Sequence, residues 1–398
     1  FRVNLVERSD VLGGNLLHLH YTLEHDDITG FTDDLVHRVK SHGNITLYLE
    51  TEVNAVAGHI GKFRVTLSEK DEETDITCGT IVVSTGADQP ETVEYLYGSS
   101  NAVITQVELE KLLHNGTFPN ETQNVVMIQC VGSRDDKRSY CSRICCSMAI
   151  KNALRIKEQN PESRVFVLYR DIRTYGFRET FYKKAREAGI LFIQYDKDSP
   201  PVVTEDNGII VTIDTPDFPE TIEIEADYVA LSTGIEASED NKRLSDMLKV
   251  PLNSDGFYVE AHLKLRPVDF ATEGIFLCGL AHSPKFIDEN ISQARAAAAR
   301  AATILSKTYI DVSAEISYVD QNKCISCMTC VKACPYTAPF VNADNKAQIE
   351  GAKCMGCGIC AAECPAGAIQ LRHFETVQFE NMFYDLFADE TMEELKES

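Results

Sequence analysis

Eight cysteines in the last quarter of the chain fall into two runs with the same spacing. The runs are Cys324-x2-Cys327-x2-Cys330-x3-Cys334-Pro335 and Cys354-x2-Cys357-x2-Cys360-x3-Cys364-Pro365. This spacing is typical of paired [4Fe–4S] clusters, in which each run gives three thiolates to one cluster and its last cysteine to the other. We therefore expect one ligand set of Cys324, Cys327, Cys330 and Cys364, and a second of Cys354, Cys357, Cys360 and Cys334.

Zinc sites and disulfides account less well for this cysteine pattern. Zinc sites seldom combine C-x2-C-x2-C with a following C-P, and a disulfide framework would need an oxidising compartment. Neither accounts for an internal repeat. Residues 311–373 resemble a bacterial-type ferredoxin domain with two clusters, which predicts that the chain transfers single electrons.

A second group of four cysteines lies in a place where a nucleotide could bind. Residues 124–129 and 164–169 read as strands with a helix at about 142–157 between them, which is a βαβ unit. The turn of such a unit cradles a pyrophosphate when it is built from small residues. Here the turn contains thiols instead, at Cys130, Cys141, Cys145 and Cys146.

These four thiols can be interpreted in three ways. They could be buried structural cysteines, or a redox disulfide between Cys145 and Cys146 or between Cys141 and Cys145. Four cysteines in such a short segment, in a chain with other clusters, favour a third [4Fe–4S] cluster. Its charge would be offset by nearby cations: Arg134, Lys137, Arg138 and Arg143. The remaining Cys78 and Cys278 lie in or beside apolar strands and are expected to pack.

Three separated segments are typical of a flavin-binding domain. Residues 2–6 predict a strand that ends in Glu7, the position that binds the adenosine ribose in such domains, and Gly13-Gly14 follow. A buried strand is expected at 80–87, breaking at Thr85-Gly86. Residues 226–235 repeat the same pattern of an apolar strand that ends in Thr-Gly. These strand exits mark the two halves of the domain and the crossings between them.

The third segment runs from Gly274 through Gly279 to Pro284 and an alanine-rich helix at about 289–307. The positive N-terminus of this helix would stabilise negative charge on a reduced flavin ring, so FAD is implied. Lys285 is the candidate cation at the ring, although a surface lysine beside a proline turn is an equal alternative. The candidate flavin contacts are Glu7, Gly13, Gly14, Thr85, Gly86, Gly279, Lys285, Asp288 and Gln293.

One expected part of the flavin site is absent from the sequence. A G-x-G-x-x-G loop should lie about 15 to 20 residues before Glu7, at the first strand of the domain. Two sources remain open: a longer polypeptide or a partner chain that provides the pyrophosphate loop.

Length and charge limit the remaining possibilities. A chain of 398 residues suggests two or three domains, and its formal charge of −23 disfavours nucleic acid or an anionic membrane surface as a partner. The sequence has no run of 18 apolar residues and no visible signal peptide. Oxygen-sensitive clusters would be protected in a reducing cytoplasm.

Together these motifs resemble the A subunit of heterodisulfide reductase over nearly the whole chain. The resemblance rests on Cys130-Val-Gly-Ser-Arg134, Tyr140-Cys141-Ser-Arg-Ile-Cys145-Cys146, the Thr-Gly pair, Gly279-x4-Pro284-Lys285 and the ferredoxin runs. It implies an α/β flavoprotein of the two-dinucleotide-binding, thioredoxin-reductase-like type, with a C-terminal bacterial-type 2[4Fe–4S] ferredoxin domain. It also implies that nicotinamide binding is lost and that Cys130, Cys141, Cys145 and Cys146 ligate the inserted cluster. The glycine loop and the N-terminal cluster-binding extension of longer members are missing.

The resemblance implies an electron-transferring, electron-bifurcating subunit of a multi-subunit complex. Implied partners are a disulfide-reducing subunit, an iron–sulfur linker subunit, a hydrogenase or formate dehydrogenase module, and ferredoxin. Three alternatives stay open. The chain could serve a quinone-linked or acyl-CoA reductase complex, act as a flavin-free relay, or be an NAD(P)H oxidoreductase, which the cysteine-filled turn disfavours.

The expected domain boundaries follow from these segments. They are a first FAD half at 1–90, an inserted pseudo-nicotinamide domain with its cluster at 91–225, a second FAD half at 226–310, the ferredoxin domain at 311–373 and an acidic tail at 374–398. In the tail, Phe379, Phe383, Leu386 and Phe387 recur at helical spacing. We expect this apolar stripe to pack on its own chain, with docking on a partner as the alternative.

Overall fold

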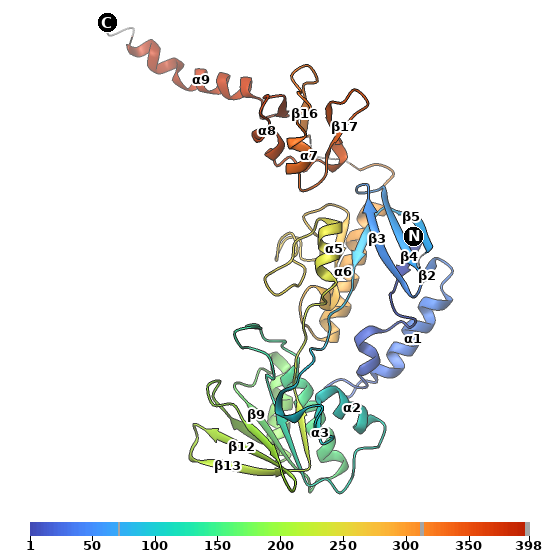
Figure 1. The fold of residues 1–398 in the computed structure, drawn as a ribbon, viewed down its shortest axis with the longest axis vertical. Helices are drawn as coiled ribbons and strands as arrows, with labels where there is room; N and C mark the ends of the chain where they lie inside the picture. Colours follow the sequence, from blue (N-terminus) through green and yellow to red (C-terminus); the bar gives the residue numbers. More distant parts are fainter. Residues whose placement is uncertain (71, 311–313, 395–398) are drawn as a thin grey trace.

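The computed structural model describes residues 1–70, 72–310 and 314–394. Three bodies follow one another along the long axis of the molecule (Figure 1). The flavoprotein-type body lies in the middle, the inserted α/β domain at one end and the ferredoxin domain at the other. Within the described ranges, no helix combines the length and the apolar character needed to cross a bilayer.

The inserted domain is built on a five-stranded parallel sheet. Its strand order is β10-β9-β8-β14-β7. The strands are β7 Val103–Thr105, β8 Asn124–Ile128, β9 Arg164–Tyr169, β10 Leu191–Gln194 and β14 Tyr228–Leu231. The expected βαβ unit is therefore present as β8, α3 (Cys145–Gln159) and β9, with β8 and β9 in parallel register.

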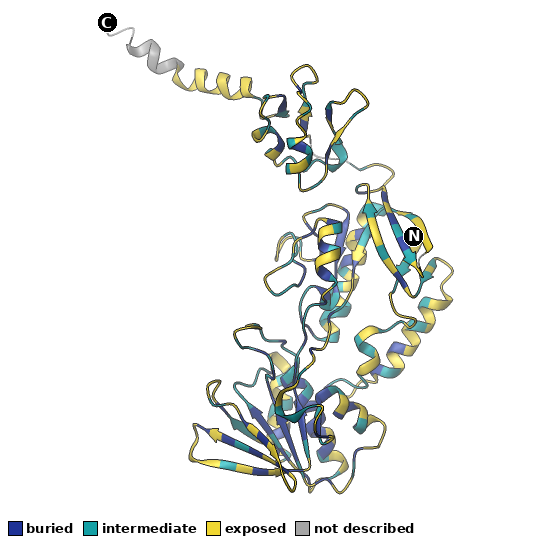
Figure 2. Ribbon diagram, viewed as in Figure 1, coloured by how far each residue is buried: buried dark blue, intermediate teal, exposed yellow. Residues whose placement is uncertain are grey.

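Both faces of this sheet are covered, as a parallel sheet requires. Val125 and Met127 of β8 pack in the core that includes α2 (Gln106–His114), α3 and α4 (Glu179–Glu187), while Val126 and Ile128 pack in the core on the opposite face. An antiparallel sheet covers that second face, with strands β11 Val202–Glu205, β12 Ile209–Thr215 and β13 Phe218–Ala226. Figure 2 shows the sheet as the most deeply buried part of the chain.

The position of β14 changes one of the expected domain boundaries. We expected residues 226–310 to form the second FAD half, but β14 is hydrogen-bonded between β7 and β8 as a strand of the inserted domain. The chain returns to the flavoprotein body only after Leu231. The return crossing runs beside the outward one, because Asp88 and Glu236 exchange two backbone hydrogen bonds of 2.9 Å.

The flavoprotein body contains two short parallel strand pairs. β1 (Val3–Val6) pairs with β2 (Ile45–Tyr48), and β6 (Ile81–Val83) pairs with β15 (Ile275–Leu277). The other elements are the antiparallel strands β3 Thr51–Ala57, β4 Phe63–Glu69 and β5 Glu72–Cys78, and the helices α1 Ile28–Ser41, α5 Asn241–Leu248 and α6 Ile287–Leu305.

Among the described residues, β1 and β6 each have one sheet neighbour. A doubly wound sheet has the order 3-2-1-4-5, which places one more strand between the equivalents of β1 and β6. Val3 and Val82 are 46 % and 41 % exposed, unlike Val125–Ile128 of the central strand β8, which are fully buried. The expectation of a buried strand at 80–87 was thus wrong for Val82, because β6 lies at an open sheet edge.

The ferredoxin domain repeats one unit twice. Each unit has a short helix within a cysteine run, α7 (Thr329–Ala333) and α8 (Ile359–Ala362), and these helices pack against each other. Two antiparallel pairs complete the domain: β16 (Ser317–Val319) with β19 (Ile369–Leu371), and β17 (Pro339–Val341) with β18 (Ala347–Ile349). His59 of the flavoprotein body lies 3.4 Å from Glu350, just before the second cysteine run.

Helix α9 (Thr376–Glu394) projects away from the ferredoxin domain (Figures 1 and 2). Phe379, Phe383 and Leu386 of its apolar stripe are 44 %, 57 % and 66 % exposed. Phe379 contacts Phe374 at a ring distance of 6.5 Å. The stripe is therefore not buried against the rest of the chain, and the expectation that it packs there was wrong.

Candidate functional site

Two cavities in the ferredoxin domain are each lined by four cysteines. One cavity, of about 410 Å³ with its open mouth, is lined by Cys324, Cys327, Cys330 and Cys364. The other, of about 310 Å³, is lined by Cys334, Cys354, Cys357 and Cys360. These are the two sets expected from the spacing, including the exchange of the last cysteine between the runs. The remaining lining is mostly apolar.

Backbone amides point at several of these sulfurs. Ala347 N–H donates to Cys324 Sγ at 3.4 Å, and Ala368 N–H donates to Cys364 Sγ at 3.3 Å. In the other cavity, Ser317 N–H donates to Cys354 Sγ at 3.4 Å. Donors of this kind stabilise thiolate charge and set the reduction potential of a cluster. Sulfur-only donor sets in apolar cavities with amide donors fit [4Fe–4S] clusters.

The inserted cysteines are gathered at the carboxyl end of β8 and the start of α3. Cys130 follows β8 with φ +62°, and Cys145 and Cys146 form the first turn of α3. Burial raises the pKa of the Cys145 thiol well above its usual value, and neighbouring sulfurs of Cys146, Cys130 and Cys141 raise it further. The four side chains thus lie close enough to repel one another as thiolates.

The return crossing holds this cysteine loop in place. Val131 N–H donates to Ser232 O at 3.1 Å, and Ser142 Oγ accepts a hydrogen bond of 2.9 Å from Ile235 N–H. Gly234 has φ +84°, and a Cβ added there would lie 2.6 Å from Ser142 Oγ. Glycine is required at this Thr-Gly exit because the loop packs directly on it.

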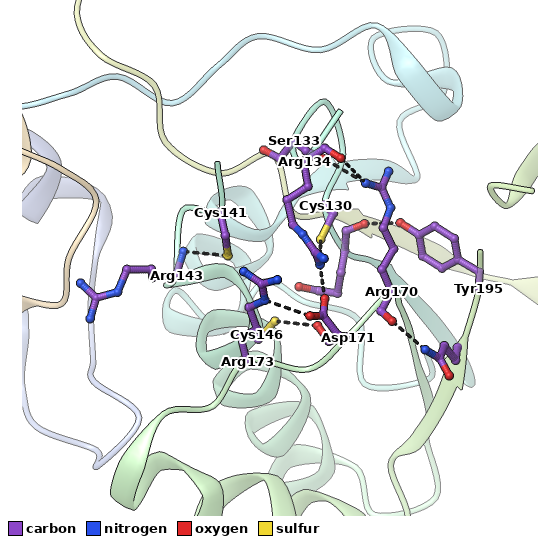
Figure 3. Close-up of polar contacts among 12 residues, drawn as sticks. Cys130, Ser133, Arg134, Cys141, Arg143, Cys146, Arg170, Asp171, Arg173 and Tyr195 are labelled. Carbon is purple, nitrogen blue, oxygen red and sulfur yellow. Dashed lines mark hydrogen bonds and ion pairs between the residues drawn. The ribbon is translucent and has the colours of Figure 1, made fainter. Parts of the chain in front are cut away.

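Cations surround the inserted quartet, as Figure 3 shows. Arg134 donates to Cys130 Sγ at 3.8 Å and to Asp171, which also accepts a 3.0 Å hydrogen bond from Arg173. Burial raises the pKa of Cys130, whereas Arg134 and then Arg170 lower it. Burial likewise raises the pKa of Cys146 to about 12. Thiolates in this position depend on these cations or on a bound metal, which deprotonates its ligands.

Within the described residues, no three His, Cys, Asp or Glu side chains are placed to hold one metal ion. A zinc site would bring its sulfurs within about 2.3 Å of one centre. None of the fourteen cysteines, every one of them in the described ranges, forms a disulfide.

The first group of expected flavin contacts comes together around one crossing. Gly13 and Gly14 have φ +131° and +51°, and the following Asn15 donates a 2.7 Å hydrogen bond to Ala87 O. Gly86 has φ +79° with open space where a Cβ would project. The double-glycine turn is therefore fixed against the Thr85-Gly86 exit, and it leaves room for a ligand beside bare backbone.

The second group lies at the start of α6. Gln293 Oε1 accepts a 2.9 Å hydrogen bond from Gly279 N–H, and Lys285 Nζ donates to Gly279 O at 2.7 Å. Lys285 is 8 % exposed, and burial lowers its pKa to about 8. Asn290 Oδ1 is buried and has no hydrogen-bond partner among the described residues. An unsatisfied acceptor at a helix start beside bare backbone fits a ligand such as a flavin.

Two members of this second group were missed by sequence reasoning. His282 Nε2 lies 2.8 Å from Glu260 Oε2, and its Nδ1 lies 2.8 Å from Gln293 Nε2. Single His and Glu residues outside any spaced motif gave no signal. Asp288, by contrast, was expected at the flavin but is 3.1 Å from Arg178 with a largely exposed carboxylate. Glu7 accepts from Ser9 N–H at 2.9 Å, at the end of β1.

Comparisons with known proteins agree with this geometry. Residues 317–371 match the family model described as a 4Fe-4S dicluster domain. The fold is similar to T. acidophilum thioredoxin reductase, with a TM-score of 0.51 at 14 % identity over 77 % of this chain and 90 % of that one. The body is thus a thioredoxin-reductase-like, two-dinucleotide-binding flavoprotein fold joined to a ferredoxin domain.

Two relatives decide the family. The chain is 39 % identical over 344 residues to the iron-sulfur A subunit of CoB–CoM heterodisulfide reductase from Methanocaldococcus jannaschii, covering 80 % of this chain and 51 % of that protein. It is 30 % identical to the iron-sulfur A 1 subunit of the same reductase from Methanopyrus kandleri, covering 100 % of this chain and 75 % of that protein. The chain spans about half the length of the first curated relatives it matches. It belongs to the family of iron–sulfur A subunits of heterodisulfide reductase, which are oxidoreductase subunits.

Proposed function

We propose that the chain binds FAD and three [4Fe–4S] clusters and transfers electrons within a heterodisulfide reductase-type complex. The observation that carries this proposal is the third thiol quartet, at the βαβ turn where a pyridine nucleotide would otherwise bind. Two clusters would be held in the ferredoxin cavities, and the third by Cys130, Cys141, Cys145 and Cys146. FAD would lie between the double-glycine turn and the start of α6.

The residues at the flavin position support a role in dividing electron pairs. A flavin bound at this position would supply both two-electron and one-electron redox chemistry. Lys285 and the N-terminus of α6 would stabilise negative charge at the ring. Asn290 Oδ1 is free to accept a hydrogen bond from the ligand.

The complete reaction would bifurcate electrons. Two oxidations of a two-electron donor release four electrons, of which two reduce ferredoxin and two, with two protons, cleave one disulfide into two thiols. The donor module would be a hydrogenase or formate dehydrogenase. The disulfide would be reduced on another subunit, reached through an iron–sulfur linker subunit.

The pyrophosphate of FAD would be bound by a strand and glycine loop that this sequence lacks. The open edges of β1 and β6 support this, because one parallel strand between them would complete the doubly wound order. Its loop would then meet a helix N-terminus, the usual site of a pyrophosphate. Refolding the chain with such a segment should bury Val3 and Val82 and raise its flavin affinity. Unchanged affinity would contradict this part of the proposal.

Metal and flavin content test the function directly. Anoxically purified protein should contain about 12 irons per chain for three clusters, against about 8 for two. With the completing segment, it should release about one FAD on denaturation. NADH and NADPH should not bleach the protein. About eight irons, or rapid bleaching by NADPH, would instead favour a nicotinamide-dependent reductase joined to a ferredoxin.

A further inference from the structure

We propose that Arg143 electrostatically couples the inserted cluster to the flavin position, and so sets both reduction potentials. This inference rests on the proposed function and assigns a role to one residue between the two redox sites. Arg143 acts through the groups it contacts and is a positioning residue.

Arg143 belongs to the cysteine loop by its backbone. Its N–H donates to Cys141 Sγ at 3.3 Å. Its φ of +65° is uncommon for a residue with a side chain. This backbone conformation turns the N–H towards the sulfur while the side chain leaves in another direction, as Figure 3 shows.

The side chain of Arg143 reaches the start of α6. Nη2 lies 2.8 Å from Glu289 Oε1, and Nη1 donates to Pro284 O at 3.4 Å. The other oxygen of Glu289 accepts a 2.8 Å hydrogen bond from Phe286 N–H. One residue thus joins a sulfur of the inserted quartet to the helix start that carries Lys285.

The charge of Arg143 acts on both sites, the cysteine loop and the segment around Lys285. Burial lowers the pKa of Lys285; among the neighbouring charges, Glu289 raises this pKa and Arg143 lowers it. A cation beside a thiolate-ligated cluster stabilises the added electron, and so raises the potential of that cluster. The Arg143 and Glu289 side chains are 37 % and 36 % exposed, so solvent weakens their interaction without removing it.

The chain offers a matched control on the same helix. Arg178 pairs with the neighbouring Asp288 at 3.1 Å, and its guanidinium lies 3.7 Å over the Phe286 ring. In the described part of the chain, Arg178 is not hydrogen-bonded to a cysteine. Arg178→Met therefore removes a similar charge from the same helix start but not from the cysteine loop.

Redox titration of the full chain together with the completing segment tests the coupling. The cluster signal is followed by EPR and assigned by its loss in Cys141→Ser, and the flavin is followed by absorption. Arg143→Met should lower both potentials, with a cluster shift corresponding to about a tenfold change in the electron-transfer equilibrium, or about 59 mV. Glu289→Gln should raise the cluster potential, and the double variant should return it towards the wild-type value.

The controls separate coupling from structural damage. Arg143→Lys keeps the charge and should keep the cluster potential near wild type, and Arg178→Met should not move it. An unchanged cluster potential in Arg143→Met with full iron content would overturn the proposal, as would an equal shift in Arg178→Met. If Arg143→Met loses iron, the cluster potential of Glu289→Gln tests the proposal instead, and an unchanged potential in that variant would overturn it. A wild-type chain with about eight irons would instead show that the proposed function has failed.

Discussion

A buried ion pair fixes the inserted domain to the first FAD half. Lys151 of α3 and Glu110 of α2 are 2.7 Å apart, with side chains 8 % and 0 % exposed. Lys151 Nζ also donates to Tyr21 O at 2.9 Å, and Glu110 Oε1 accepts from His20 N–H at 2.8 Å. Residues 20 and 21, which follow the double-glycine turn, are therefore held by both charges. Glu110→Gln leaves the ammonium buried without its carboxylate.

The structure sets the size of this perturbation. Removing one partner of a buried pair costs about 3 to 5 kcal/mol, because the remaining charge stays desolvated. Each kcal/mol shifts the melting temperature of a domain of this size by about 2 to 4 °C, so we expect a loss of roughly 10 °C. The double variant Glu110→Gln with Lys151→Met removes both charges and should lose less than the two single variants together.

Hydrogen exchange and thermal unfolding measure the effect. Glu110→Gln should increase exchange at the amides of His20 and Tyr21 and lower the melting temperature of the inserted domain. Lys183→Met is the control, because Lys183 and Glu187 form an exposed pair 3.8 Å apart in the same domain and should contribute less than about 0.5 kcal/mol. Equal losses in Glu110→Gln and Lys183→Met would refute the reasoning.

Three further predictions concern the cysteine loops and the flavin position. Cys364→Ser should remove the cluster of the first cysteine run and lower the iron content from about 12 to about 8 per chain. Cys78→Ser should leave the iron content unchanged. An unchanged iron content in Cys364→Ser would contradict the exchanged ligand sets. Gly234→Ala should lower the iron content of the inserted quartet, because the new Cβ would lie 2.6 Å from Ser142 Oγ. Gly98→Ala is the control: Gly98 has φ +80° and open space around it, so this variant should only add backbone strain, measured as a small loss in melting temperature. Burial lowers the pKa of Lys285 to about 8, so its positive charge is present below that pH and lost above it. A plot of flavin potential against pH should therefore show an added downward inflection near pH 8. If the inflection persists in Lys285→Met, it belongs to another group.

Covalent spacing explains why the grouping of cysteines around the two ferredoxin cavities could be predicted. The distances within C-x2-C-x2-C are fixed by a few backbone steps, so each run can wrap only one cluster-sized cavity. The exchanged last cysteine followed from the same motif, and the cavities group Cys364 with the first run and Cys334 with the second. The Thr-Gly exits were readable because a positive φ beside a strand requires glycine.

Long-range contacts were not readable from the sequence. The placement of β14 in the inserted domain depends on which strands it pairs with, and an apolar strand fits either sheet. His282, Glu260 and the salt bridge from Arg143 to Glu289 join residues that no motif connects. The exposed stripe of α9 has the spacing of a packed helix, and spacing alone does not say which surface it packs on.

The exchange of Cys334 and Cys364 has a consequence for how this region assembles and evolves. Because each cavity takes one of its four cysteines from the other run, either half of the repeat alone would leave a cavity lined by three cysteines. During synthesis, the first cavity would gain its fourth cysteine only with Cys364, at the end of the second run. Loss of either half of the repeat would therefore affect both cavities.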